Sequence, residues 1–167
     1  QCPSFPPPPP ANDINKLRPG NIKAIMAVGD SISAGFAMSA GEFWDVLDLV
    51  EYRGDVFSVG GNPGANTVAN FLKRYNKDIV GASIGDSPPL DAIKWQGGLI
   101  QPWDAKITHL NGAQSMAKIE AVPSQIDYIT GQLNTTYKNS VDINKDWKLM
   151  TMLIGANDAC VSCYHFG

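Results

Sequence analysis

Three stretches of the chain have the pattern of strands: residues 22–29 (IKAIMAVG), 104–113 (DAKITHLNGA) and 147–154 (WKLMTMLI). The first and third are apolar runs that end in a glycine followed by polar residues, as a buried parallel strand does where it enters a loop. Residues 65–76 and 124–133 instead place apolar side chains at helical intervals. Strands that alternate with helices predict an α/β fold with a parallel sheet, and three strands make only part of such a sheet.

The first 20 residues differ in composition from the rest of the chain. They contain Pro3, an unbroken run from Pro6 to Pro10, and Pro19. A proline run favours the extended polyproline II conformation and does not join a core. We therefore predict an extended arm over residues 1–20 and one folded domain over residues 21–167.

Composition narrows the class of protein. The chain has 167 residues, of which 44% are hydrophobic, which is enough for one domain with a sizeable core. The net charge is −3, whereas nucleic-acid-binding proteins usually carry a basic face, so we expect no nucleic-acid partner. The apolar runs are too short for a membrane span, and we expect no transmembrane segment.

Two features favour a secreted protein. Asn134 begins the sequon Asn-Thr-Thr, which makes it a candidate for N-glycosylation. The chain starts at Gln1 and has no apolar leader, as expected of a chain whose signal peptide has been removed. We therefore expect an extracellular glycoprotein.

The chain contains three cysteines, Cys2, Cys160 and Cys163. An odd number in a secreted chain indicates either a free thiol or a partner outside this sequence. The Cys160-x-x-Cys163 pair is also compatible with a redox or zinc motif, but zinc needs further ligands and only His165 is near. We expect structural disulfides, local or to another segment, and neither a metal nor a cofactor.

Two predicted strands are followed by polar clusters that can carry chemistry. Gly29-Asp30-Ser31 follows the first strand and Gly155-Ala156-Asn157-Asp158 follows the last. Reactive groups of open α/β sheets gather beyond the carboxyl ends of the strands. A serine there can act as a nucleophile if a base lies beside it, and an asparagine can donate a hydrogen bond to the developing oxyanion. Gly-Asp-Ser alone is also an ordinary turn or helix cap, so the prediction depends on both clusters together.

These clusters resemble conserved blocks of the GDSL, or SGNH, hydrolases. Residues 27–37 (AVGDSISAGFA) are similar to block I of that family and residues 153–160 (LIGANDAC) to block III. Residues 51–54 (EYRG), the Ser-x-Gly-Gly of residues 58–61, and the stretch from Leu110-Asn111 to Pro123-x-Gln125 resemble its phospholipase B branch. The resemblance implies a three-layer α/β/α, flavodoxin-like sheet, of which this chain holds a part.

The resemblance also implies a role for individual residues. Ser31 matches the nucleophile, whose backbone N–H is one oxyanion donor, and Asn157 matches the side-chain donor. Asp30, Gly29, Gly155 and Asp158 would support them. The family's remaining donor is the backbone N–H of a block II glycine, a position that Met116 occupies here, with Gly112 as the alternative if the register slips.

The chain departs from the family pattern in one respect. The family's catalytic Asp and His lie in an Asp-x-x-His motif late in the domain, and this sequence has no such motif. Its two histidines are His109, which we interpret as structural, and His165, which follows the Cys-x-x-Cys segment and which we do not expect to be the base. We expect the Asp and His to come from a complementary C-terminal chain of the same precursor, without which the isolated chain should be inactive.

Two functions follow from these residues. The first is a serine ester hydrolase acting on lipid or other acyl esters, in which Phe43 and Trp44 either line an acyl pocket or pack in the core. The alternative is a non-catalytic secreted binding or defence protein on the same scaffold. The missing Asp-x-x-His favours the alternative, whereas intact Ser31 and Asn157 favour the hydrolase.

Overall fold

The computed structural model describes residues 6–39, 50–87 and 103–165. Phe43 and Trp44 lie outside these ranges. Two parallel strands, β1 (Ile22–Gly29) and β2 (Trp147–Leu153), form the sheet, and their register runs from Ile22 beside Trp147 to Gly29 beside Leu153. The helices are α1 (Ser31–Ala34), α2 (Val68–Leu72), α4 (Ala105–Thr108), α5 (Val122–Asn134) and α6 (Ala156–His165). Short 3₁₀ turns cover Ile14–Lys16, Pro19–Asn21, Arg53–Asp55 and Ile119–Ala121.

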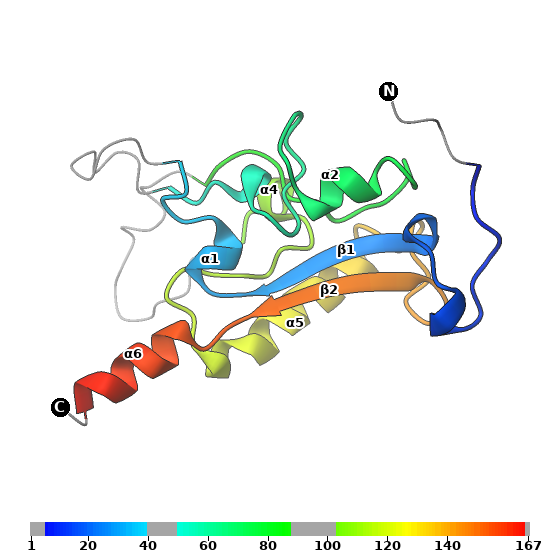
Figure 1. Cartoon of the computed structure of the whole chain (residues 1–167). Helices are drawn as coiled ribbons and strands as arrows, with labels where there is room; N and C mark the ends of the chain where they lie inside the picture. Colours follow the sequence, from blue (N-terminus) through cyan, green and yellow to red (C-terminus); the bar gives the residue numbers. More distant parts are fainter. Residues whose placement is uncertain (1–5, 40–49, 88–102, 166–167) are drawn as a thin grey trace.

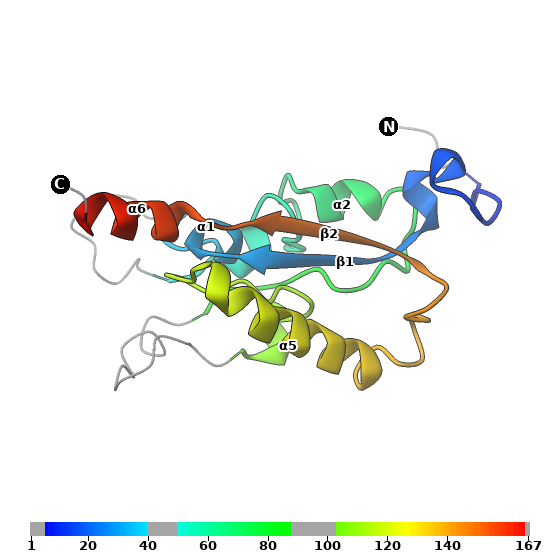
Figure 2. The ribbon, with the colours of Figure 1, turned by 90° about the horizontal axis from the view of Figure 1, so that it is seen from below.

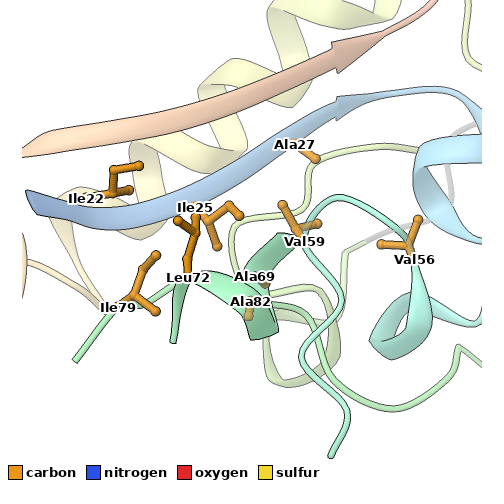
Figure 3. Packing of buried hydrophobic residues seen from close by; sticks show 9 residues of the cluster. All are labelled: Ile22, Ile25, Ala27, Val56, Val59, Ala69, Leu72, Ile79 and Ala82. Atoms are coloured by element: carbon orange, nitrogen blue, oxygen red, sulfur yellow. The ribbon is translucent and has the colours of Figure 1, made fainter. Parts of the chain in front are cut away.

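The molecule has three layers, with α2 over one face of the sheet and α5 over the other (Figures 1 and 2). Side chains of β1 alternate between these two layers, as the pleat of a strand requires. Ile25 and Ala27 pack with α2 and the segments around it (Figure 3), whereas Ala24, Met26 and Val28 pack against α5. This arrangement agrees with the predicted α/β/α architecture and comprises part of such a domain.

The predicted strands at 22–29 and 147–154 and the predicted helix at 124–133 are confirmed as β1, β2 and α5. The helix predicted at 65–76 is shorter and runs over Val68–Leu72, capped by the Thr67 side chain, which accepts a hydrogen bond from the Asn70 N–H.

The strand predicted at 104–113 is wrong. Residues Ala105–Thr108 form α4, because the Asp104 side chain caps the helix by accepting from the Lys106 N–H at 2.9 Å. Only an isolated bridge between Asn111 and Ala27 continues the sheet there, and Val80 forms a similar bridge to Ala24. Within the described residues the sheet therefore has two strands and not three.

The described part of the proline arm, residues 6–20, lies beside the amino-terminal ends of the strands (Figure 1). Asn21 Nδ2 donates to the Pro9 carbonyl at 2.9 Å, and the Trp147 indole N–H donates to the Ala11 carbonyl at 2.7 Å. Within the arm the proline run folds back close to Gly20, where a Cβ would lie 2.7 Å from Pro8. The arm and the carboxyl ends of the strands are at opposite ends of the sheet.

Candidate active site

Ser31 is the first residue of α1, immediately beyond the end of β1. Asp30, which is 1% exposed, caps this helical turn by accepting from the Ile32 N–H at 3.0 Å. The Asp30 N–H in turn donates to the Leu153 carbonyl at 3.3 Å, so the turn begins where β1 and β2 are still paired. Ser31 itself is half-buried. The GDS sequence therefore caps the helical turn and also places a serine at the carboxyl end of β1.

The residue before this turn, Gly29, is held on both of its polar backbone groups. Its N–H donates to Gln125 Oε1 at 2.8 Å, and its carbonyl accepts from Gln125 Nε2 at 2.9 Å and from the Gln114 N–H at 3.2 Å. A Cβ at Gly29 would lie 2.3 Å from the Leu153 carbonyl oxygen and 2.6 Å from Ser33 Oγ. Only glycine fits between these groups, which fixes the direction in which the chain leaves β1.

A tight turn over residues 114–117 contains the predicted block II donor. The Ala117 N–H closes the turn on the Gln114 carbonyl at 3.1 Å, and Met116, its third residue, has a φ of 65°. A positive φ at this position usually calls for glycine, and Met116 adopts it with a side chain that is 57% exposed. The Gly112 N–H, by contrast, donates to the Ala27 carbonyl at 2.8 Å as part of the sheet edge.

The second polar cluster is attached to the same turn. Asn157 and Asp158 lie in the first turn of α6, just beyond the end of β2. Asn157 Nδ2 donates to the Ala117 carbonyl at 2.9 Å, and the Asp158 carboxylate accepts from the Ile119 N–H at 3.1 and 3.2 Å. The Asn157 amide uses one of its two N–H groups in this contact. Gly155, with a φ of 114°, makes the bend between β2 and α6.

Hydrogen bonds thus connect three segments that are far apart in sequence: the turn after β1, the turn over residues 114–117, and the start of α6. The group offers a serine hydroxyl, a side-chain amide and the amide N–H of a left-handed residue at one edge of the sheet. Such a set can support acyl transfer through a tetrahedral oxyanion.

A comparison with protein families decides which class of protein this is. The family model described as GDSL-like Lipase/Acylhydrolase matches residues 25–166. The chain belongs to this GDSL-like lipase/acylhydrolase family. The match includes every segment of the site, from the turn after β1 to the start of α6.

Three mammalian proteins named phospholipase B1, membrane-associated, are similar to this GDSL-like chain. The mouse protein is 32% identical over 161 residues, which cover 92% of this chain and 10% of the mouse protein. The rat protein is 32% and the human protein 30% identical over 155 residues, which cover 90% of this chain and 9% of each relative. The chain therefore spans about a tenth of these relatives. No solved structure matches it.

The histidines of the GDSL-like chain occupy different surroundings. His109 Nδ1 lies 2.6 Å from the hydroxyl of Tyr137, which follows α5, and the His109 carbonyl accepts from the hydroxyl of Tyr128 in the middle of α5 at 2.9 Å. Burial lowers the pKa of His109 and, together with the Tyr128 charge, raises the pKa of Tyr137 to about 12. His165 is the last residue of α6. That His109 is structural therefore stays a prediction.

Other predicted residues have simpler outcomes. Cys160 and Cys163 are free and exposed on α6, so no disulfide joins them, and Cys2 lies outside the described residues. Asn134 is exposed as the last residue of α5. Among the described residues, no three His, Cys, Asp or Glu side chains gather as metal ligands would. No helix in the same part of the chain is both long and apolar enough to cross a bilayer.

Sequence reasoning missed the buried side chains that support the backbone of the site. Gln125, which is fully buried, was part of a family resemblance but had no assigned role, and its partner Gly29 is 96 residues away. Glu51 and Arg53 likewise belonged to a family-like stretch, and both are buried. Two charged residues in a buried segment would indicate an ion pair or a hydrogen-bond network. The sequence did not show that this segment is buried.

Proposed function

We propose that this chain is the nucleophile-bearing part of a serine ester hydrolase, with Ser31 as the nucleophile. The observation that supports this most is the hydrogen-bonded group formed by the Ser31 turn, the Met116 turn and the Asn157 helix start. Each of these segments provides one of the groups that acyl transfer needs. All three lie within the residues that match the family of lipases and acylhydrolases.

In the proposed reaction, Ser31 Oγ attacks the acyl carbonyl of the ester while its proton passes to a histidine base. The N–H groups of Ser31 and Met116 and the Asn157 amide hold the oxyanion. Collapse of the intermediate expels the alcohol, whose oxygen takes up the proton that the base received from Ser31. A water molecule then attacks the acyl-enzyme while the base takes its proton. The acid is released as Ser31 leaves and recovers a proton from the base. Met116 is preferred to Gly112 as the backbone donor, because the Gly112 N–H is already bonded to Ala27.

The base and its aspartate would come from a further polypeptide segment of the same precursor. The exposed strand β2 supports this part of the proposal. Met150, Met152 and Leu153 are 38, 53 and 41% exposed, although strands of a parallel sheet are normally covered on both faces. Among the described residues β2 pairs only with β1, which leaves its outer edge open for another strand.

Lipid acyl esters are the proposed substrates. The relatives are named phospholipases, and apolar side chains surround the site in this chain: Ile32, Met116 and Ile119 are each at least 55% exposed. We also propose that the protein is secreted and glycosylated at Asn134. A non-catalytic binding protein receives no support from the family match, which is to hydrolases.

A fluorophosphonate probe tests the nucleophile directly. Two preparations are compared: the 167-residue chain alone, and the chain together with any sequence that follows Gly167 in its gene. We expect strong labelling of the Ser31 peptide in the second preparation and little in the first, because serine needs its base. Ser31→Ala should abolish labelling and esterase activity while leaving the circular dichroism spectrum unchanged, and Ser33→Ala serves as the neighbouring control. An active Ser31→Ala protein would refute the assignment.

A further inference from the structure

The backbone of residues 111–116 is irregular and yet largely buried. Asn111, Gly112, Ala113 and Gln114 are buried, and Met116 follows in the left-handed conformation. A segment without helix or strand cannot satisfy its own N–H and carbonyl groups, so other residues must do so. The conformation of this segment, and with it the direction of the Met116 N–H, therefore depends on side chains from elsewhere in the chain.

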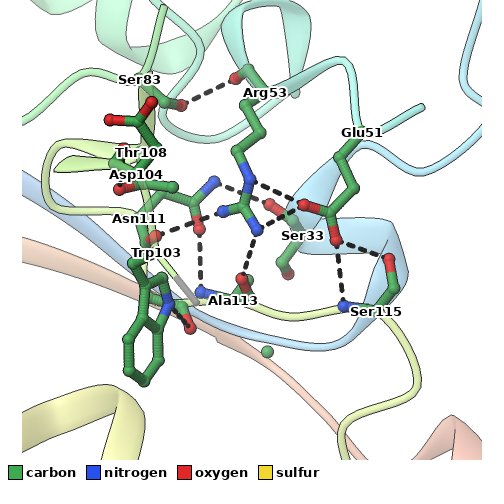
Figure 4. A network of polar contacts seen from close by, with 12 residues as sticks. Ser33, Glu51, Arg53, Ser83, Trp103, Asp104, Thr108, Asn111, Ala113 and Ser115 are labelled. Carbon is green, nitrogen blue, oxygen red and sulfur yellow. Dashed lines mark hydrogen bonds and ion pairs between the residues drawn. The ribbon is translucent and has the colours of Figure 1, made fainter. Parts of the chain in front are cut away.

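A buried ion pair supplies several of these contacts (Figure 4). Arg53 Nε and Nη2 donate to Glu51 Oε2 at 2.9 and 2.6 Å. The same guanidinium donates from Nη1 to the Asn111 carbonyl at 3.3 Å and from Nη2 to the Ala113 carbonyl at 2.9 Å. Its rigid, planar fork thus fixes two carbonyls that are two residues apart, which a lysine ammonium does not do.

The carboxylate of the pair binds the other end of the segment. Glu51 Oε1 accepts from the Ser115 N–H at 3.2 Å and from Ser115 Oγ at 2.7 Å. Arg53 and Glu51 together therefore hold both ends of residues 111–115, directly before Met116. The two side chains are only 2 and 4% exposed.

The network also reaches the nucleophile turn. Asn111 Nδ2 donates to the Ser33 carbonyl in α1 at 3.0 Å, and Asn111 Oδ1 accepts from the Ala113 N–H at 3.1 Å. One set of contacts thus positions the Met116 turn and the Ser31 helix relative to each other. A buried ion pair contributes little net stability compared with apolar packing, but it can specify one backbone geometry.

We propose that Glu51, Arg53 and Ser115 are positioning residues, which set the Met116 N–H toward the oxyanion that forms beside Ser31. None of the three touches the substrate. Their loss would leave Ser31 in place but let the backbone donor move, so the transition state would lose more stabilisation than the bound substrate. This inference rests on the proposed esterase function.

Ser115→Ala is the mildest test, because it removes one hydroxyl contact and leaves the ion pair intact. In the preparation that the probe labels, we expect kcat for a water-soluble ester to fall about 10-fold, with KM changed less than twofold. Ser115→Thr, which keeps the hydroxyl, should retain at least half of the wild-type kcat. Glu51→Gln should lower kcat about 100-fold or more, toward the loss seen when an oxyanion donor is removed.

Ser124→Ala is the matched control. Its hydroxyl bonds the Ala121 carbonyl at 2.8 Å near the start of α5, outside this network, and kcat should stay within twofold of wild type. The proposal is overturned if folded Ser115→Ala and Glu51→Gln proteins both keep wild-type kcat. If Glu51→Gln does not fold, the Ser115 variants decide alone.

Amide hydrogen exchange separates this inference from the proposed function. In the 167-residue chain, Ser115→Ala should speed exchange of the amides of residues 112–116 at least 10-fold and leave β1 amides unchanged. Unaltered exchange there would overturn the positioning role whether or not the protein is an esterase. Faster exchange in a protein that hydrolyses no ester would refute the function but keep the network.

Discussion

β1 and β2 are paired along their whole lengths but differ in burial. Seven of the eight residues of β1 are buried, the exception being Lys23, because the α2 layer covers one face and α5 the other. No residue of β2 is fully buried, although five of its seven residues are apolar. An apolar sequence therefore does not by itself give a buried strand, because coverage depends on which layers extend far enough.

The two halves of the candidate site therefore differ in how far the core of the chain holds them. Ser31 follows the buried strand, and the residue before its turn is clamped by fully buried Gln125. Asn157 follows the exposed strand and begins a helix whose described side chains are half-buried or exposed. We infer that Ser31, the proposed nucleophile, is held by the core of this chain, whereas Asn157 is held mainly by its contact with the turn over residues 114–117.

Truncation of a side chain on each strand gives the largest expected contrast. Ile25→Ala on β1 removes a side chain that is 0% exposed and should lower the free energy of unfolding by about 2–5 kcal/mol, because a cavity remains. Met152→Ala on β2, where the side chain is 53% exposed, should change it by about 0.5 kcal/mol or less. Urea unfolding followed by circular dichroism measures both, and equal losses would remove the distinction between the strands.

A change at the clamp of β1 should have a smaller effect. Gln125→Leu leaves the buried Gly29 N–H without its acceptor and should cost about 1–3 kcal/mol in unfolding free energy. The control is Gln132→Leu on the same helix, whose amide oxygen accepts from the exposed Thr136 hydroxyl, and it should cost about 0.5 kcal/mol or less. Similar losses in the two variants would show that the Gly29 contact adds no stability.

The smallest effect concerns the chain beside β1, where the Ala27 N–H donates to the Leu110 carbonyl and His109 precedes Leu110. Burial, and to a lesser degree the Lys73 charge, lowers the pKa of His109 in the fold from 6.5, so the unfolded chain binds its proton more readily. Stability should therefore fall as the pH drops through about 6.5.

This pH effect is tested by comparing the native protein with His109→Gln, in which no imidazole can titrate at that position. Urea midpoints measured between pH 8 and pH 5 should decline more steeply in the native protein, because only the native protein has an imidazole at position 109. Both proteins keep His165, so its titration does not contribute to the difference. Parallel pH profiles would mean that His109 is equally easy to protonate in the folded and unfolded chains.

The parts of the fold that were predicted correctly are those whose signal is local. β1 and β2 are nearly unbroken apolar runs, and α5 has apolar residues at helical spacing after Pro123. Residues 104–113 failed because a cap competed with the apolar pattern: Asp104 caps α4, and the Thr108 hydroxyl bonds back to the Asp104 carbonyl at 2.8 Å. An aspartate is a common helix N-cap residue, so Asp104 was available in the sequence as a helix-start signal.

The site was predictable to the extent that it follows strand ends. Ser31 and Asn157 come directly after apolar runs, and the parallel sheet brings both to one edge. The choice between Met116 and Gly112 could not be made from spacing, because it depends on which N–H the sheet uses. Gln125 was also out of reach, since its contact with Gly29 joins residues that only tertiary packing brings together.

The contact between the proline arm and β2 also has a consequence for the order of folding. The Trp147 indole meets the Ala11 carbonyl across 136 positions of the sequence. Pairing of the strands brings Trp147 beside Ile22 and so closes most of this loop, which leaves only the short segment between Ala11 and Ile22 for the arm to close afterwards. The arm should therefore dock last and detach first, as a latch on a core that is already assembled.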